Sequence, residues 1–285
     1  IPLLQIIGNY GFSSTSLTSV NFDQLTQIGD YSFSDCSLLS VFDAPMLSSI
    51  GSYCFKSTAL ISIQFEHLAM INNQGHSFES CSKLEVVHLN NVETLETFLF
   101  KDCTSLNTIT GTKITTIKDS CFSGCIKLST ITFPSLVTIG DNAFSGIETI
   151  TEVDFENVKT VGLSAYQNCI KLKTVVLNSC QSIDAFSFRY CNELTRVEMP
   201  ELRSISYAAF SDTGLTSIDF PKLDSLNIGT VDGNKNVGGQ FMNCKYLESV
   251  NAPLVSKLTN KMFYGCSKLN KLEMENVEII EPHSI

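Results

Sequence analysis

The sequence predicts a solenoid, in which about twelve units of 22 residues stack in register and each adds one short strand to a parallel sheet. Two observations carry this prediction: an aromatic residue returns at a fixed interval, and an aliphatic residue, usually leucine, follows it six residues later in most units. Every interval from Phe78 to Phe210 is 22 residues long. The aromatic column comprises Phe12, Phe33, Phe55, Phe78, Phe100, Phe122, Phe144, Tyr166, Phe188, Phe210, Phe241 and Phe263.

The unit that begins at Phe122 shows the other columns most clearly. If the aromatic is counted as zero, Cys125 stands at plus 3, Leu128 at plus 6 and Ile131 at plus 9. Residues 130–133, Thr-Ile-Thr-Phe, alternate polar and apolar side chains, which is typical of a strand with one buried face. One strand per unit cannot form a hairpin. We therefore expect it to pair in parallel with the next unit, about 4.8 Å away.

The segment before each aromatic predicts one short helical turn. Glycines such as Gly51 and Gly140 stand just before it and would let the chain bend. A second short strand is expected at 137–139. Position minus 3 holds a helix-capping residue type in seven units, namely Asn9, Asp30, Ser52, Thr97, Asp119, Asp141 and Asn260.

This repeat resembles the BspA-like (treponemal-type) class of leucine-rich repeat over the whole chain. The residues of the clearest unit that match the class are Leu128, Ile131, Phe133, Pro134, Leu136, Ile139, Gly140, Ala143 and Phe144. Departures include Ile147 in place of Cys and Gly111 in place of an apolar residue. The resemblance implies a leucine-rich repeat solenoid, with its parallel sheet on the concave face and short helical turns and short strands on the other sides.

A residue type that repeats in register should form a ladder inside the solenoid. The predicted core comprises Phe33, Phe55, Phe78, Phe100, Phe122, Phe144, Phe188, Phe210, Phe241, Phe263, Cys81, Cys103 and Cys125. Neighbouring ladder thiols would stand one strand spacing apart, which is too wide for an unstrained disulfide. The short C-x₂-C pairs found in many zinc sites are absent. We therefore expect free, buried thiols. Three units, at 12–17, 55–60 and 210–215, have Thr in place of this Cys and reach their leucine one residue early.

Composition excludes several classes of function. The formal net charge is −10 and the sequence pI is about 4.9, which opposes nucleic-acid binding. No run of about 18 apolar residues occurs, so we expect no transmembrane segment. The four histidines are widely separated, and no hydrolase or metalloprotease motif occurs. We expect no enzymatic activity, no catalytic residue, no cofactor and no metal site.

The unbroken repeat predicts a single leucine-rich repeat domain over residues 1–285. Ile1 stands inside a repeat and Ile285 stands where the next aromatic is due, so we expect a fragment of a longer protein. Two units are longer than the others, with insertions near 72–76 and 227–239. Such insertions form surface loops on one face of a solenoid.

The outward side chains of the predicted strands are the candidate binding surface. Their column is Thr-rich in its middle and acidic in its second half. A regular strip of hydrogen-bonding groups suits an extended protein surface or a glycan, although every sheet with one exposed face must present polar residues there. The candidate binding residues are His88, Thr110, Thr132, Asp154, Glu198, Asp219 and Glu273.

The resemblance implies a protein-interaction module of the cell-surface or secreted adhesin type, which would bind extracellular matrix or host-cell surface proteins, or proteins of neighbouring cells. The sequence leaves two alternatives open. One is an intracellular repeat scaffold in the cytoplasm, and the other is a repeat appendage of a larger enzyme.

Overall fold

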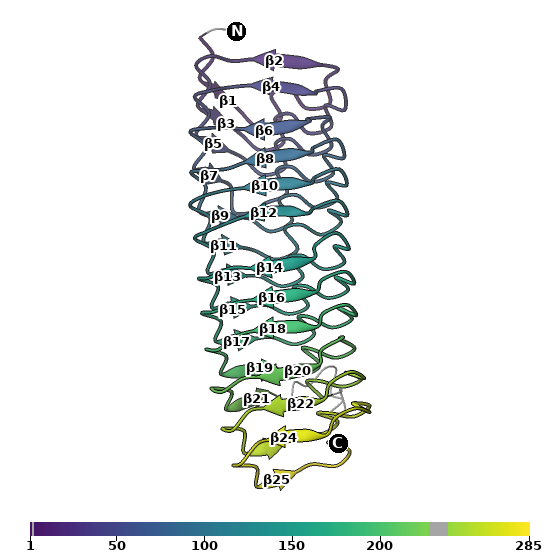
Figure 1. Cartoon of the computed structure of the whole chain (residues 1–285). Helices are drawn as coiled ribbons and strands as arrows, with labels where there is room; N and C mark the ends of the chain where they lie inside the picture. The colour runs from purple at the N-terminus through teal and green to yellow at the C-terminus, as the bar shows by residue number, and fades with distance from the viewer. Residues whose placement is uncertain (2, 228–238) are drawn as a thin grey trace. The chain divides into compact units, whose positions relative to one another are not determined.

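The computed structural model describes residues 1, 3–227 and 239–285, and they form a parallel β-solenoid of about twelve turns. The chain divides into two compact units, Ile1–Leu136 and Val137–Ile285. In each unit the strands lie in two rows, and each coil adds one strand to each row (Figure 1). The predicted insertion at 227–239 falls almost entirely outside the described residues.

The first unit has six coils with a long and a short strand each. The three-residue strands are β2 (Ser19–Asn21), β4 (Val41–Asp43), β6 (Ser62–Gln64), β8 (Val86–His88), β10 (Thr108–Thr110) and β12 (Thr130–Thr132). The two-residue strands are β1 (Ile6–Ile7), β3 (Gln27–Ile28), β5 (Ser49–Ile50), β7 (Met70–Ile71), β9 (Thr94–Leu95) and β11 (Thr116–Ile117).

The second unit repeats this arrangement. One row comprises β14 (Glu152–Asp154), β16 (Thr174–Val176), β18 (Arg196–Glu198), β20 (Ser217–Asp219), β22 (Ser249–Asn251) and β24 (Lys271–Glu273). The other comprises β13 (Thr138–Ile139), β15 (Thr160–Val161), β17 (Ser182–Ile183), β19 (Ser204–Ser206), β21 (Ser225–Asn227), β23 (Lys257–Leu258) and β25 (Ile279–Ile280). The expected second strand at 137–139 is therefore present as β13.

Strand pairing is parallel and keeps the sequence columns in register. Ile109 of β10 lies between Val87 of β8 and Ile131 of β12. In the second unit Val175 of β16 lies between Val153 and Val197. The prediction that strands of successive 22-residue repeats pair in parallel is thus confirmed within each of the two compact units.

The predicted aromatic and cysteine core is also confirmed. All ten core phenylalanines and the three core cysteines are at most 1 % exposed. The rings stack nearly parallel, with centroids 5.4 Å apart between Phe78 and Phe100 and 5.3 Å apart between Phe188 and Phe210. Each such pair adds about 0.5–1.5 kcal/mol to the free energy of burial.

All eleven cysteines are free and buried, as expected. Each thiol of the plus 3 ladder donates a hydrogen bond to the carbonyl of the aromatic residue in the preceding coil. Cys103 Sγ lies 3.1 Å from Phe78 O, and Cys191 Sγ lies 3.2 Å from Tyr166 O. Burial raises the pKa of Cys169 to about 12, so this thiol stays protonated and able to donate.

The structure explains the three units that carry Thr. In two of them the hydroxyl bonds its own coil's aromatic carbonyl, from Thr58 to Phe55 O and from Thr213 to Phe210 O, each at 2.9 Å. Both hydroxyls also lie 3.2 Å from the sulfur of the next ladder cysteine. In these two shorter turns, the Thr hydroxyl therefore bonds the same carbonyl oxygen that the thiol of the next ladder cysteine bonds.

The prediction of short helical turns is wrong, because no helix occurs in residues 1, 3–227 or 239–285. Around most of the aromatics, alternate amides instead bond the next coil. Tyr31 N, Phe33 N and Asp35 N donate to carbonyls of that coil at 2.8–3.0 Å. Tyr31 and Asp35 have φ of 57° and 62°, and these left-handed residues turn alternate peptide groups outward. The amides that lie between these donate to carbonyls of their own coil, as Cys36 N does to Phe33 O.

Three of the residues expected to cap helices, Asn9, Asp30 and Asp141, accept hydrogen bonds from the following coil instead. Asn9 Oδ1 accepts the amide of Asp30 at 2.9 Å, and Asp30 Oδ1 accepts the amide of Ser52 at 2.8 Å. Asp141 Oδ1 accepts the amide of Leu163 at 2.8 Å. These side chains satisfy the backbone of the following coil, 21 or 22 residues along the sequence.

Candidate functional site

The outward side chains of the three-residue strands in the first unit form a continuous row. Pairing places Gln64, His88, Thr110 and Thr132 on four adjacent strands, β6, β8, β10 and β12. His88 Nδ1 lies 2.7 Å from Thr110 Oγ1. The predicted candidates of this unit are therefore brought together, and two of them already bond each other.

In the corresponding row of the second unit, uncharged residues separate some of the acids and basic residues pair with others, so the row carries less unbalanced negative charge than the acids alone suggest. Val176 separates Asp154 from Glu198, and Asn251 separates Asp219 from Glu273. Three of the four acids also have partners on the same strand or on the adjacent one. Arg196 pairs with Glu198, Lys271 pairs with Glu273 at 2.8 Å, and Asn251 donates to Asp219 at 2.9 Å.

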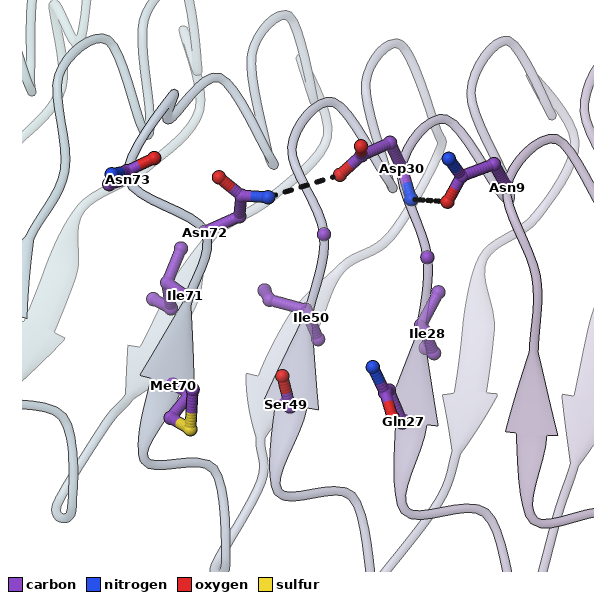
Figure 2. A pocket seen from close by; sticks show the side chains of 12 residues that line it. Asn9, Gln27, Ile28, Asp30, Ser49, Ile50, Met70, Ile71, Asn72 and Asn73 are labelled. Carbon is purple, nitrogen blue, oxygen red and sulfur yellow. Dashed lines mark hydrogen bonds between the residues drawn. The ribbon is translucent and has the colours of Figure 1, made fainter.

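Two grooves lie beside the short strands, and the sequence analysis did not predict them. The first groove, in the first unit, has a volume of about 490 Å³. It crosses the ends of β3, β5 and β7 (Figure 2). Its lining residues are Asn9, Gln27, Ile28, Gly29, Asp30, Ser49, Ile50, Gly51, Met70, Ile71, Asn72 and Asn73.

The second groove, in the second unit, has a volume of about 520 Å³ and lies beside β13, β15, β17, β19 and β21. Its outward residues on these strands are mainly hydroxyl-bearing. The lining residues are Thr138, Ile139, Gly140, Asp141, Thr160, Val161, Gly162, Ser182, Ile183, Asp184, Ser204, Ser206 and Asn227.

Both grooves are lined by two successive glycines that directly follow the short strands, Gly29 and Gly51 in one and Gly140 and Gly162 in the other. These glycines were expected to let the chain bend, but Gly29, Gly51 and Gly162 lie outside the left-handed region. These positions hold glycine because a side chain would collide with the preceding coil. A Cβ on Gly51 would lie 2.4 Å from Gly29 C, and one on Gly162 would lie 2.6 Å from Asp141 Oδ1.

Elsewhere in the first unit larger side chains occupy this column. Glu96 follows β9 and Lys118 follows β11, and their charged groups approach to 2.6 Å. Each groove thus coincides with a pair of successive glycines in this column.

A row of stacked surface aromatics in the first unit was also missed. Tyr10, Tyr31, Tyr53 and His76 stack at centroid distances of 4.9, 4.7 and 4.4 Å, and Phe98 continues the row. We call these five residues the ring ladder. All have positive φ, which costs a residue with a side chain roughly 1–2 kcal/mol. Reading the column two residues before each core aromatic would have revealed it.

One ring-ladder residue belongs to a cluster of charged groups. Glu79 is 8 % exposed. One of its carboxylate oxygens, Oε2, lies 2.8 Å from His76 Nδ1 and 3.2 Å from Lys56 Nζ. Lys101 Nζ lies 3.6 Å from its other oxygen. Burial raises the pKa of Glu79, but the bonds from His76 and Lys56 outweigh burial and leave the pKa below its ordinary value.

The described part of the chain shows no arrangement suited to a metal ion. No group of three or more His, Cys, Asp or Glu that could hold one occurs there. In the same residues no helix is long and apolar enough to cross a membrane.

Comparison with known families decides the relationship of the chain. The model of the BspA type leucine-rich repeat region matches residues 5–126, 115–236 and 238–284. The chain belongs to the BspA-type leucine-rich repeat family. No curated protein shows significant similarity to this BspA-type chain.

Solved structures agree with this membership. A leucine-rich repeat protein from Bacteroides ovatus ATCC 8483 is 26 % identical, with a TM-score of 0.66 over 98 % of this chain and 82 % of that one. A leucine-rich repeat protein from Eubacterium ventriosum ATCC 27560 is 20 % identical, with a TM-score of 0.50 over 81 % of this chain and 80 % of that one. The second likeness concerns the fold alone.

Proposed function

We propose that this BspA-type repeat chain is a protein-interaction module that binds other proteins through its three-residue strands. The observation that carries the proposal is the register of the outward side chains. On adjacent strands of one sheet, His88, Thr110 and Thr132 repeat at one strand spacing, about 4.8 Å. A fixed array of hydrogen-bonding groups suits an extended partner surface.

The second unit adds charge to this surface. Asp154, Glu198, Asp219 and Glu273 lie in the same column, and basic residues on the same strands pair with two of them. A partner with basic groups would compete for these acids. Rim charges of this kind influence the association rate and its salt dependence more than the final affinity.

We further propose a cell-surface or secreted adhesin, with extracellular matrix, host-cell surface or neighbouring-cell proteins as partners and glycans as a second class of partner. Family membership supports this assignment. The match to a leucine-rich repeat region favours a binding role over an enzymatic one. An intracellular scaffold and an appendage of a larger enzyme are the competing hypotheses.

The test is charge reversal on this face. The quadruple variant Asp154→Lys, Glu198→Lys, Asp219→Lys and Glu273→Lys should keep the fold, because all four side chains are at least partly exposed. It should weaken retention on immobilised extracellular matrix proteins at least tenfold. Arg196 and Lys271 would then face added positive charge without their partners.

The matched control reverses four exposed acids away from these strands, Glu148, Glu193, Glu275 and Glu278. It changes the net charge by the same amount. Equal loss in both variants would indicate a general charge effect. Retention of the face variant at the level of the unmodified protein would refute the strand-face hypothesis.

A further inference from the structure

The first groove has a polar rim with little charge. Among its lining residues Asp30 is the only ionisable one, and neither Lys nor Arg lines it. Anionic ligands such as phosphates or sulfated chains would therefore meet one carboxylate and no cation. The lining suits a ligand that is neutral and rich in hydrogen-bonding groups.

The backbone along the groove is already bonded. Gly29 N donates to Ile7 O at 2.8 Å, Gly51 N to Ile28 O at 2.7 Å and Asn72 N to Ile50 O at 3.0 Å. A peptide that added a strand would need free backbone donors and acceptors. Recognition in the first groove must therefore come from side chains.

Planar polar side chains lie along one edge of the groove, as Figure 2 shows for Asn9, Asp30, Asn72 and Asn73. Asn72 Nδ2 donates to Asp30 Oδ1 at 3.3 Å, and Asn9 Oδ1 accepts the Asp30 amide. The second carboxylate oxygen of Asp30 and the amide nitrogen of Asn9 have no hydrogen-bond partner among the described residues. The edge thus offers donors and acceptors one coil apart.

The floor and the neighbouring surface are apolar. Ile28 and Ile50 lie under the groove with 1 % exposure each. Two of the edge residues, Asn9 and Asp30, are followed directly by ring-ladder tyrosines. Sugars present hydroxyl groups that both donate and accept, together with C–H surfaces that pack on apolar groups. Amide and carboxylate side chains beside the apolar side chains of the groove, Met70 among them, match both properties.

We propose that the first groove binds a neutral oligosaccharide, with Asn9, Asp30, Asn72 and Asn73 bonding its hydroxyl groups. The site lies beside the short strands and uses none of the residues proposed for protein binding. It would give the module a second binding site and assign the glycan class of partner to the first groove. The second groove lacks the ring ladder and has two acids, so it is the internal comparison.

The test is calorimetric titration of the full chain with three neutral probes, cellotetraose, chitotetraose and mannotetraose. We expect saturable binding of at least one of them and none of the anionic probe sialyllactose. Ser49→Tyr places a ring in the first groove and should lower affinity for that probe at least tenfold. Thr116→Tyr is the matched control, because Thr116 holds the same position in another short strand of the same unit and does not line the first groove.

A second variant keeps the proposal testable if Ser49→Tyr does not fold. Asn73 is exposed and its side chain makes no hydrogen bond within the described residues, so Asn73→Ala should fold normally and lower affinity. Three results would overturn the proposal: no saturable binding of any neutral probe, full binding by both groove variants, or equal loss in Thr116→Tyr. The charge-reversal test of the strand face is independent of all three.

Discussion

The first and second grooves share one construction and differ in their edges. In each, two successive glycines follow short strands, and an Asn or Asp of the preceding coil reaches over a glycine to the next backbone amide. The first groove adds amides, Met70 and edge residues that directly precede ring-ladder tyrosines in the sequence, whereas the second has hydroxyls and a second acid, Asp184. The shared part is what stacking requires, and the differing part is where a ligand preference can be built.

The largest effect should come from the core that both units share. Phe55→Ala in the first unit and Phe188→Ala in the second should each cost about 3–5 kcal/mol of unfolding free energy, because each removes a ring held between two others. Urea denaturation measures both. A loss below about 1 kcal/mol in one unit alone would show that the two cores are not equivalent.

Glycine substitution tests the construction of the first groove. Gly51→Ala should cost about 1–3 kcal/mol, since its Cβ would meet backbone atoms of the preceding coil that cannot yield. Gly8 holds the same column with nothing within 4 Å, so Gly8→Ala is the matched control and should be nearly neutral. Equal destabilisation of the two in thermal unfolding would contradict the steric explanation.

Acid titration should separate the units. Glu79 has a lowered pKa when folded, so its stabilisation is present above the unfolded value of about 4.3 and is lost as pH falls through the folded value. Glu79→Gln should therefore cost about 1–3 kcal/mol at pH 7 and little near pH 3. Glu201→Gln, at an exposed ion pair of the second unit, should cost under about 1 kcal/mol at either pH.

The sequence predicted the repeat, the parallel register, the Phe ladder and the buried thiols, because each depends on side chains that recur in one column. It did not predict the turn. Asn9 and Asp30 do accept hydrogen bonds from backbone amides, as capping residues would, but those amides lie 21 or 22 residues further along the chain. The spacing within one repeat cannot distinguish a local hydrogen bond from one between coils. His76 was assigned to an insertion, yet it stacks between Tyr53 and Phe98.

The grooves were missed for a related reason. Each groove is lined by two glycines in successive coils, a pattern that becomes visible only when neighbouring repeats are compared. The alternation of Val176 and Asn251 with the acids could be read in the column. The pairing of Glu198 with Arg196 and of Glu273 with Lys271 required side-chain conformations.

The smallest effect should come from the ring ladder. Tyr31→Asn places in the first unit the residue that the second unit has at Asn142. Loss of stacking, about 0.5–1.5 kcal/mol per pair, is offset because Asn tolerates a positive φ. We expect a net change under about 1 kcal/mol in urea denaturation, with weaker oligosaccharide binding. A cost above about 2 kcal/mol would assign the ladder to stability.

The thiol ladder makes the chain report on its own folding. Alkylating reagents attack thiolates that they can reach, and every cysteine here is enclosed, several with strongly raised pKa values. Iodoacetamide should therefore label only molecules whose coils have opened. Mass spectrometry of the tagged peptides would rank the coils by how often each one separates from its neighbours.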